Sequence, residues 1–395
     1  MTSLVVELAE YQEAEVAISP HAERVLRRVA GPRLTTRPAN EGTFAIRASS
    51  HVGAITTPDV TVIIRPKIDT DIVLYLLEAD GQALRLDRAD VELLGSQDLV
   101  PAVATLYAKQ LERLVGAGVV RGYRRIEEGL PTIRGRIDLA RQAGSGGLAI
   151  PVQCVYDDFV ADTRLNRRVR GAALRLLQLP GLAGETTVRL RRMLAAFDQV
   201  GELRPADLVL PSRFTRLDEH YRTIDALATI VLRHASLQLH GGPTKVSAFT
   251  IDMNTVFEAF VATRLRRLLA GRSVIEAKRF RPLDLHRRSR ISPDLVFADP
   301  GGPVRYVADT KYKLTSQGFA RDTDYYQLLA YTTALDLPEG LLIYAAGEQT
   351  LPREILVGRS ETRLRSYSLQ LTGRPPDIDR RMSELADLIA GQVSR

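Results

Sequence analysis

The chain has 395 residues, a length that suggests two or three domains. Its 45% hydrophobic and 26% charged content are ordinary globular values, which exclude a disordered or fibrous protein. The net charge of +7 suits a polyanionic partner without identifying one, and Cys154, the single cysteine, excludes an intramolecular disulfide and a cysteine-rich zinc site.

The N-terminal segment carries Glu7, Glu10 and Glu13 where a signal peptide would have positive charge and an apolar run. No stretch approaches 18 uninterrupted apolar residues, so no membrane span is expected. Together with the low cysteine content, these features predict a cytoplasmic protein.

Residues 1–95 have the pattern of a β-rich domain. The runs Leu4–Leu8, Thr43–Ala48 and Val60–Arg65 contain β-branched, partly alternating side chains that are typical of strands. One helix is predicted over His21–Val29. A small barrel or sheet is the simplest architecture for this part.

Residues 96–245 are predicted to form a mainly helical domain. Apolar residues recur three and four positions apart in four segments, which are Ala102–Val115, Leu165–Leu177, Thr187–Phe197 and Tyr221–His234. A flexible loop is expected at 142–148 and a linker at 240–244.

The second of these helices has a basic face, made of Arg164, Arg167, Arg168, Arg170 and Arg175. A solvated helix face is the simpler interpretation, and binding of DNA or a protein partner is the alternative.

Residues 246–395 alternate between helix and strand. The expected order is helix Phe257–Leu269, strands Val274–Phe280, Leu295–Phe297 and Arg305–Thr310, helix Asp324–Leu335 and strand Gly340–Ala345. This order predicts an α/β domain with a mixed central sheet. The chain as a whole is therefore expected to be a multidomain α/β protein.

Three residues of this last domain are candidates for a catalytic centre. Asp309 and Lys311 are two positions apart on a predicted strand, so their side chains point to the same face. Asp294 begins the preceding strand of a predicted hairpin. The hairpin can bring two carboxylates and one ammonium group together at one edge of the sheet.

Carboxylate oxygens are the ligands that Mg²⁺ prefers, and Mn²⁺ is an alternative metal. A metal held here would lower the pKa of a bound water and neutralise charge developing on a phosphate. Lys311 could deprotonate or orient that water, or stabilise the pentacovalent phosphate, and the sequence does not separate these roles. The alternative is a cluster of surface ion pairs at a strand end.

The motif Pro293-Asp294…Asp309-Thr310-Lys311 resembles that of the PD-(D/E)xK nuclease superfamily. The resemblance implies a restriction-endonuclease-like fold for residues 246–395 and hydrolysis of DNA phosphodiesters. It also implies that Glu258 on the preceding helix and the Thr310 carbonyl join Asp294 and Asp309 as metal ligands.

The same resemblance implies active-site roles for Gln327 and Tyr331, which lie four positions apart on the following helix. Glu258 could instead be a helix cap or a boundary residue. Gln327 and Tyr331 could instead serve helix–sheet packing.

Further segments resemble the nuclease-subunit (McrC) family of McrBC-type modification-dependent restriction systems. They are His51–Thr56, Ile63–Ile68, Ile133–Asp138, Asp162–Asn166 and Phe249–Phe260. The resemblance implies a subunit that caps an McrB-like AAA+ GTPase ring, stimulates its hydrolysis and cuts double-stranded DNA carrying 5-methylcytosine. The chain has no G-x-x-x-x-G-K-[ST] phosphate loop, so the motor is expected to be a separate protein.

A basic run before Asp294 is a candidate DNA-binding segment. The residues assigned to phosphate contact are Lys278, Arg279, Arg281, Arg288 and Arg290, together with Lys313 after the catalytic motif. A solvated arginine-rich loop is the alternative.

Two other functions remain open at this point. A non-catalytic adaptor would activate the GTPase and keep the nuclease fold as a scaffold. A stand-alone nuclease would need no motor, although residues 1–245 far exceed what cutting alone requires. The six histidines show no metalloprotease spacing, so a zinc hydrolase is not expected.

Overall fold

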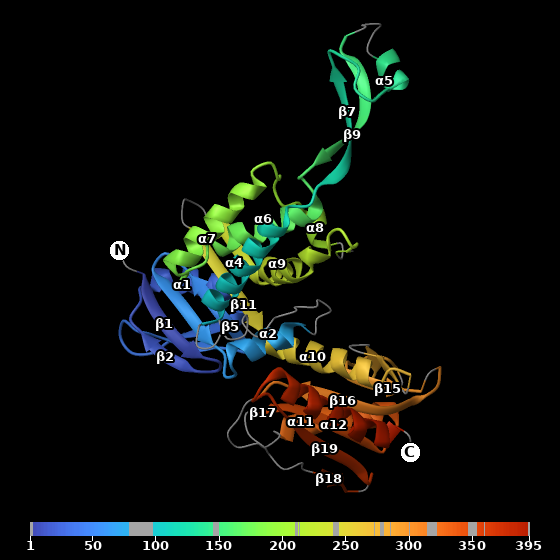
Figure 1. Cartoon of the computed structure of the whole chain (residues 1–395). Helices are drawn as coiled ribbons and strands as arrows, with labels where there is room; N and C mark the ends of the chain where they lie inside the picture. Colours follow the sequence, from blue (N-terminus) through green and yellow to red (C-terminus); the bar gives the residue numbers. More distant parts are fainter. Residues whose placement is uncertain are drawn as a thin grey trace. The chain divides into compact units, whose positions relative to one another are not determined.

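The computed structural model describes residues 3–78, 98–144, 150–209, 212, 214–239, 245–271, 273–276, 280–284, 286–299, 301–313, 322–346, 354–358 and 360–393. The expected linker at 240–244 and most of the expected loop at 142–148 lie outside them. The chain divides into two compact units (Figure 1), Met1–Ala102 with Leu237–Arg395, and Val103–Ser236. None of the described helices is both long and apolar enough to span a bilayer.

The N-terminal part of the first unit is β-rich, as predicted. Its five-stranded sheet has the order β1-β6-β5-β11-β10, with bounds Leu4–Ala9, Val60–Arg65, His51–Thr56, Lys245–Asp252 and Ala235–Leu239. A three-stranded sheet has the order β2-β4-β3, with bounds Glu13–Val16, Phe44–Ala48 and Leu34–Pro38. Helix α1 (Pro20–Ala30) is capped by Ser19 and followed by η1 (Gly31–Arg33), and α2 spans Thr70–Glu78.

The strand β11 corrects the expected domain boundary at 245/246. It pairs antiparallel with β5, so that Phe249 lies opposite Ala54 in the N-terminal sheet. The neighbouring Gly53 has a φ of 127°, and a Cβ there would lie 2.1 Å from the Phe249 carbonyl oxygen. Only glycine permits this close approach. Residues up to Asp252 therefore belong to the N-terminal sheet, through a pairing across nearly 200 residues that local pattern does not reveal.

The second unit contains the predicted helices and a β-ribbon that was not predicted. Its helices are α4 (Leu99–Ala117, which begins in the first unit), α5 (Leu139–Ala143), α6 (Arg164–Leu176), α7 (Gly184–Leu194), η2 (Ala195–Phe197), α8 (Pro205–Val209), η3 (Glu219–Tyr221) and α9 (Arg222–His234). The ribbon consists of β7 (Gly122–Leu130), β8 (Arg136–Ile137) and β9 (Val152–Val160). Within this unit it extends away from the other helices, with α5 beside its outer end (Figure 1).

The basic face of α6 is not solvated, which corrects the interpretation of its arginines. The Arg168 guanidinium pairs with Asp225, with both side chains at most 4% exposed. The Arg167 guanidinium bonds both oxygens of Asp207 at 2.9 and 3.0 Å. Arg167 and Arg168 therefore bind the helices of the unit to one another and are not available to DNA or a partner.

Asn166 fixes the base of the ribbon to the helices. Its side-chain nitrogen donates to the carbonyl oxygens of Val120 and Ala161, which flank β7 and β9. Its oxygen accepts a hydrogen bond from the Tyr221 hydroxyl at 2.5 Å. The D-T-R-L-N segment therefore has a structural role at the root of the ribbon.

The C-terminal part of the first unit contains a six-stranded mixed sheet. The order is β12-β15-β16-β17-β19-β18, with bounds Val274–Glu276, Leu295–Ala298, Val304–Lys311, Glu339–Ala346, Thr362–Gln370 and Glu354–Val357. The helices are α10 (Met253–Leu268), α11 (Asp322–Leu335) and α12 (Pro375–Val393), and a short hairpin joins β13 (Arg281–Pro282) to β14 (Arg290–Ile291). The predicted mixed sheet is confirmed, whereas β18, β19 and α12 were not predicted.

The two faces of this sheet carry different helices. Val307 of β16 packs in one apolar cluster with Leu328 and Tyr331 of α11. The ring of Tyr312, directly after β16, packs instead against Phe257 of α10. Because side chains alternate along a strand, Asp309 and Lys311 face α11.

Candidate active site

The hairpin of β15 and β16 brings Asp294 to Asp309. Leu295 lies opposite Ala308 in the antiparallel register, so continuing the register by one residue places Asp294 opposite Asp309. The Asp294 Oδ2 atom accepts hydrogen bonds from the Thr310 amide and hydroxyl, each at 2.8 Å. These two bonds fix the first carboxylate relative to the strand that carries the second.

Asp309 is almost completely buried, with 1% of its surface exposed. The Lys311 Nζ atom lies 2.5 Å from Asp309 Oδ2 as an ion pair. No side chain or backbone group of the described residues makes a hydrogen bond of acceptable geometry to that same oxygen. The ion pair thus compensates the charge of Asp309 but leaves the directional bonding of its oxygen unsatisfied.

Burial and the neighbouring Asp294 both act on the acidity of Asp309. The pKa of Asp309 is raised to about 7, because burial and, to a smaller extent, the negative charge of Asp294 raise it more than Lys311 lowers it. Two carboxylates that repel one another in a buried site are an arrangement that a bound cation would stabilise.

A chain of hydrogen bonds orients Lys311. Its ammonium donates to Gln327 Oε1 at 2.9 Å, and Gln327 Nε2 donates to the Tyr331 hydroxyl at 2.6 Å. The hydroxyl in turn donates to the carbonyl oxygen of Ser292, at 3.4 Å. Burial raises the pKa of Tyr331 to about 12, so the hydroxyl keeps the proton that it donates. The structure therefore brings Gln327 and Tyr331 to the site.

The residues at this edge fit a metal that takes few protein ligands. Asp294 and Asp309 provide hard oxygen atoms, one of them buried without a hydrogen bond. Mg²⁺ commonly binds one or two carboxylates, with water and substrate oxygens completing its shell. Among the described residues no group of three or more His, Cys, Asp or Glu side chains is arranged to hold a metal. Glu258, a half-buried residue of α10, thus forms no three-carboxylate cluster with the aspartates here.

The six residues assigned to DNA contact differ in their environments. Arg288 and Arg290 are exposed at the β13–β14 hairpin, just before Ser292. Arg281 is held by Glu276 at 2.7 Å, and Lys313 is held by Asp324 at 2.6 Å. Lys278 and Arg279 lie outside the described residues. Two of these cations are therefore already paired with carboxylates.

Asp324 is a site-proximal residue that the sequence analysis missed. It is 5% exposed and accepts hydrogen bonds from Lys313 and from the Tyr344 hydroxyl, the latter at 2.8 Å. It lies three positions before Gln327, on the same face of α11. The three-residue spacing from Gln327 was a signal in the sequence that Asp324 lies near the site. Acidic residues are also common in the first turn of a helix, because they interact favourably with the helix dipole.

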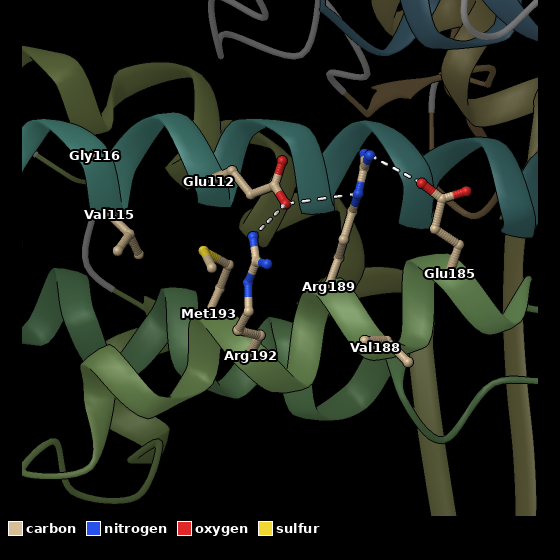
Figure 2. Close-up of a pocket in the computed structure, with 8 residues that line it drawn as sticks. All are labelled: Glu112, Val115, Gly116, Glu185, Val188, Arg189, Arg192 and Met193. Carbon is tan, nitrogen blue, oxygen red and sulfur yellow. Dashed lines mark hydrogen bonds and ion pairs between the residues drawn. The ribbon is translucent and has the colours of Figure 1, made fainter.

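An open groove of about 830 Å³ in the second unit is not a comparable site. Figure 2 shows that its charged side chains pair with one another across α4 and α7. Glu112 contacts Arg189 at 3.6 Å and Arg192 at 3.8 Å, and Arg189 also pairs with Glu185 at 3.0 Å. The remaining lining residues are Val115, Gly116, Val188 and Met193. The groove contains no nucleophile or acid–base pair directed at a ligand.

Comparisons with known proteins give a family and a fold. The family model described as "McrBC 5-methylcytosine restriction system component" matches residues 46–345. A chain of the refined half-complex from a tetradecameric assembly of Thermococcus gammatolerans McrB AAA+ hexamers with bound McrC is similar with a TM-score of 0.67 and 20% identity. The similarity covers 98% of this chain and 100% of that chain, which establishes a common fold.

A chain of the Thermococcus gammatolerans McrBC complex has a TM-score of 0.46 and 21% identity, over 71% of this chain and 90% of that chain. No curated protein matches in sequence.

Proposed function

Because the chain belongs to the family of McrBC 5-methylcytosine restriction system components, we propose that it is the DNA-cutting subunit of such a system. The observation that carries the proposal is the convergence of Asp294, Asp309 and Lys311 at one edge of a mixed sheet. Two close carboxylates with one ammonium group suit metal-assisted hydrolysis of a phosphodiester.

In this proposal Asp294 and Asp309 would hold Mg²⁺, with Mn²⁺ as an alternative metal and the Thr310 carbonyl as a further candidate ligand. Bound Mg²⁺ supplies Lewis-acid stabilisation of the phosphate and lowers the pKa of a coordinated water. Thr310 holds the Asp294 carboxylate in place through its amide and hydroxyl. Hydrolysis adds water at phosphorus and breaks the bond to the leaving oxygen of the DNA strand.

Lys311 acts at the phosphate or at the attacking water. As an ammonium it stabilises the negative charge of the pentacovalent phosphate, and as a free amine it takes the proton of the water. Gln327 orients the Lys311 Nζ atom for either role. The Tyr331 hydroxyl fixes which end of the Gln327 amide faces the lysine.

In this proposal exposed arginines bind DNA beside the site. Arg288 and Arg290 lie on the hairpin that leads into Ser292-Pro293-Asp294. Guanidinium groups at this position can contact phosphates next to the one that is cut.

We assign the motor to a partner. The similar solved chain belongs to an assembly of McrB AAA+ hexamers with bound McrC. The present chain has no phosphate loop of its own. A AAA+ GTPase ring that reads 5-methylcytosine and is stimulated by this chain is therefore the proposed partner.

Cleavage of methylated plasmid DNA in Mg²⁺ tests the proposal, with and without the candidate ring and GTP. The variant Asp309→Ala removes the buried carboxylate. Asp299→Ala is its matched control, because Asp299 lies at the opposite end of the same hairpin and pairs with Arg305. We expect ring-dependent cutting that is lost in Asp309→Ala and retained in Asp299→Ala.

Two results would change the assignment. If the chain cuts DNA without the ring and Asp309→Ala abolishes that activity, the nuclease assignment stands and the ring is not an obligate partner. If the wild-type chain cuts no DNA but still stimulates GTP hydrolysis by the ring, the chain is a non-catalytic adaptor.

A further inference from the structure

Tyr312 directly follows Lys311 but points to the other face of the sheet. Its side chain is 2% exposed and its ring packs against Phe257 of α10, with centroids 6.1 Å apart. Its hydroxyl donates a hydrogen bond to Glu10 Oε1 at 3.1 Å. The residue after the candidate catalytic lysine is therefore attached to the N-terminal sheet.

Glu10 is an unusual residue to find at this place. It follows β1, is 1% exposed, and its Oε1 atom accepts both the Tyr312 hydroxyl and the Lys67 amide, the latter at 3.0 Å. Its Oε2 atom has no hydrogen-bond partner among the described residues. Burying a carboxyl group with one oxygen unsatisfied costs stability that an apolar side chain would not cost. What this residue adds over an apolar one is an acceptor for two directional bonds, from the Tyr312 hydroxyl and from the Lys67 amide.

The backbone around Glu10 is held firmly enough to serve as an anchor. The Glu10 amide donates to the Arg65 carbonyl oxygen at 3.3 Å, which extends the parallel pairing of β1 with β6. The next residue, Tyr11, has a φ of 62°, and its amide donates to the Ser49 carbonyl oxygen. A non-glycine residue in this conformation is kept there by its surroundings.

We propose that Glu10 and Tyr312 are positioning residues for Lys311, because their hydrogen bond holds the end of β16 on the N-terminal sheet. The inference rests on the proposed nuclease function. Tyr312 cannot touch the reacting atoms, since it faces α10 whereas Lys311 faces α11. It acts through the peptide bond that it shares with Lys311. The N-terminal sheet then helps to position Lys311 in the proposed active site.

The test uses the full chain with its ring partner, GTP, Mg²⁺ and methylated DNA. Tyr312→Phe removes only the hydroxyl, and Glu10→Leu removes its acceptor. Glu10→Gln keeps an oxygen that can accept the same bond. Tyr75→Phe is the matched control, because it removes a tyrosine hydroxyl that bonds a different carboxylate of the same unit, Asp379, at 2.5 Å. Single-turnover rate, KM for DNA and thermal midpoint are measured for each.

We expect Tyr312→Phe and Glu10→Leu to slow cutting on the order of 10- to 100-fold with KM little changed, since small displacements of a catalytic group have effects of this size. The double variant is expected to be no slower than Glu10→Leu alone, because Glu10→Leu already removes the bond to Tyr312. Glu10→Gln and Tyr75→Phe are expected to cut at nearly the wild-type rate. Wild-type cutting by Tyr312→Phe would overturn the proposal, as would equal damage from Glu10→Gln and Glu10→Leu.

Hydrogen exchange separates this proposal from the nuclease assignment. If the wild-type chain cuts nothing, the proposed function fails, and exchange at residues 309–313 still decides whether the bond holds the strand. Faster exchange there in Tyr312→Phe and Glu10→Leu, but not in Tyr75→Phe, supports the positioning role. Unchanged exchange at residues 309–313 overturns it. Faster exchange that is explained by a lower thermal midpoint of the whole protein also overturns it.

Discussion

The ammonium of Lys311 donates a hydrogen bond to the side-chain oxygen of Gln327 over 2.9 Å, so a residue of α11 determines where the lysine points. The geometry of the candidate active site therefore depends on the helix as well as on the strand pair. Tyr331, one turn later, holds the Gln327 amide in the orientation that offers its oxygen.

Replacing Gln327 is expected to impair cutting without impairing DNA binding. In Gln327→Ala the lysine keeps its charge and loses its orientation, so we expect kcat to fall about 10-fold or more, within the range of acid–base and positioning effects. Tyr331→Phe leaves the amide free to rotate and is expected to have a smaller effect. Single-turnover kinetics measures both, with exposed Tyr326→Ala as the control on the same helix. Equal losses in all three variants would contradict the orienting role.

The stability of the metal-free protein is expected to depend on Asp309 and pH. The pKa of Asp309 rises from 3.8 to about 7 on folding, so the folded state binds this proton more tightly than the unfolded state. The favourable contribution is complete below about pH 4 and is lost as pH rises through about 7.

Asp309→Asn removes this loss. At pH 8 in chelator we expect the variant to exceed the wild type in unfolding free energy on the order of 2 to 4 kcal/mol, because each pKa unit corresponds to about 1.4 kcal/mol. The advantage is expected to vanish near pH 4, and added Mg²⁺ is expected to stabilise the wild type alone. Urea titrations at the two pH values measure this, and a pH-independent difference would argue against a buried, strained carboxylate.

Arg288 and Lys313 are expected to differ in their effect on DNA binding. Arg288 is exposed, whereas Lys313 is held by the buried Asp324. Arg288→Ala should reduce the slope of log affinity against log salt by about 1, as expected for one phosphate contact. Lys313→Ala should leave that slope unchanged and lower the thermal midpoint, because Asp324 loses its cation. Binding measured in Ca²⁺ over a salt series checks both, and a slope change only in Lys313→Ala would reverse the assignment.

The buried pair of Arg168 and Asp225 is expected to be essential for the second unit. Arg168→Ala leaves a carboxylate that is 3% exposed without its partner, so we expect a loss of about 3–5 kcal/mol in unfolding free energy. The double variant Arg168→Met with Asp225→Leu should recover much of this loss, since no charge remains buried. Chemical denaturation measures it, with exposed Arg191→Ala as a near-neutral control. A small loss in Arg168→Ala would mean that water reaches the pair.

The strand that carries the candidate site, β16, could be predicted because its signals are local. The two-residue spacing of Asp309 and Lys311 determines their common face, and apolar neighbours identify β16. The four-residue spacing of Gln327 and Tyr331 likewise determines a common face of α11.

Other features depend on pairings that a local pattern cannot show. The strand β7 reads G-Y-R-R-I-E-E-G-L and is largely exposed, so it lacks the apolar alternation that identifies a half-buried strand. Arg168 meets Asp225 57 positions later, and Tyr312 meets Glu10 302 positions earlier. In the sequence each of these is an ordinary charged or aromatic residue, and only the fold shows which residue it contacts.

Localised backbone cleavage tests most directly whether Asp294 and Asp309 form the metal site. Fe²⁺ with ascorbate generates hydroxyl radicals at a bound metal, and mass spectrometry maps the broken peptide bonds in the full chain. We predict scission next to Asp294 and Asp309 that excess Mg²⁺ suppresses and that Asp309→Asn abolishes, while Asp299→Asn leaves it unchanged. Scission elsewhere, or the same pattern in Asp309→Asn, would contradict the account.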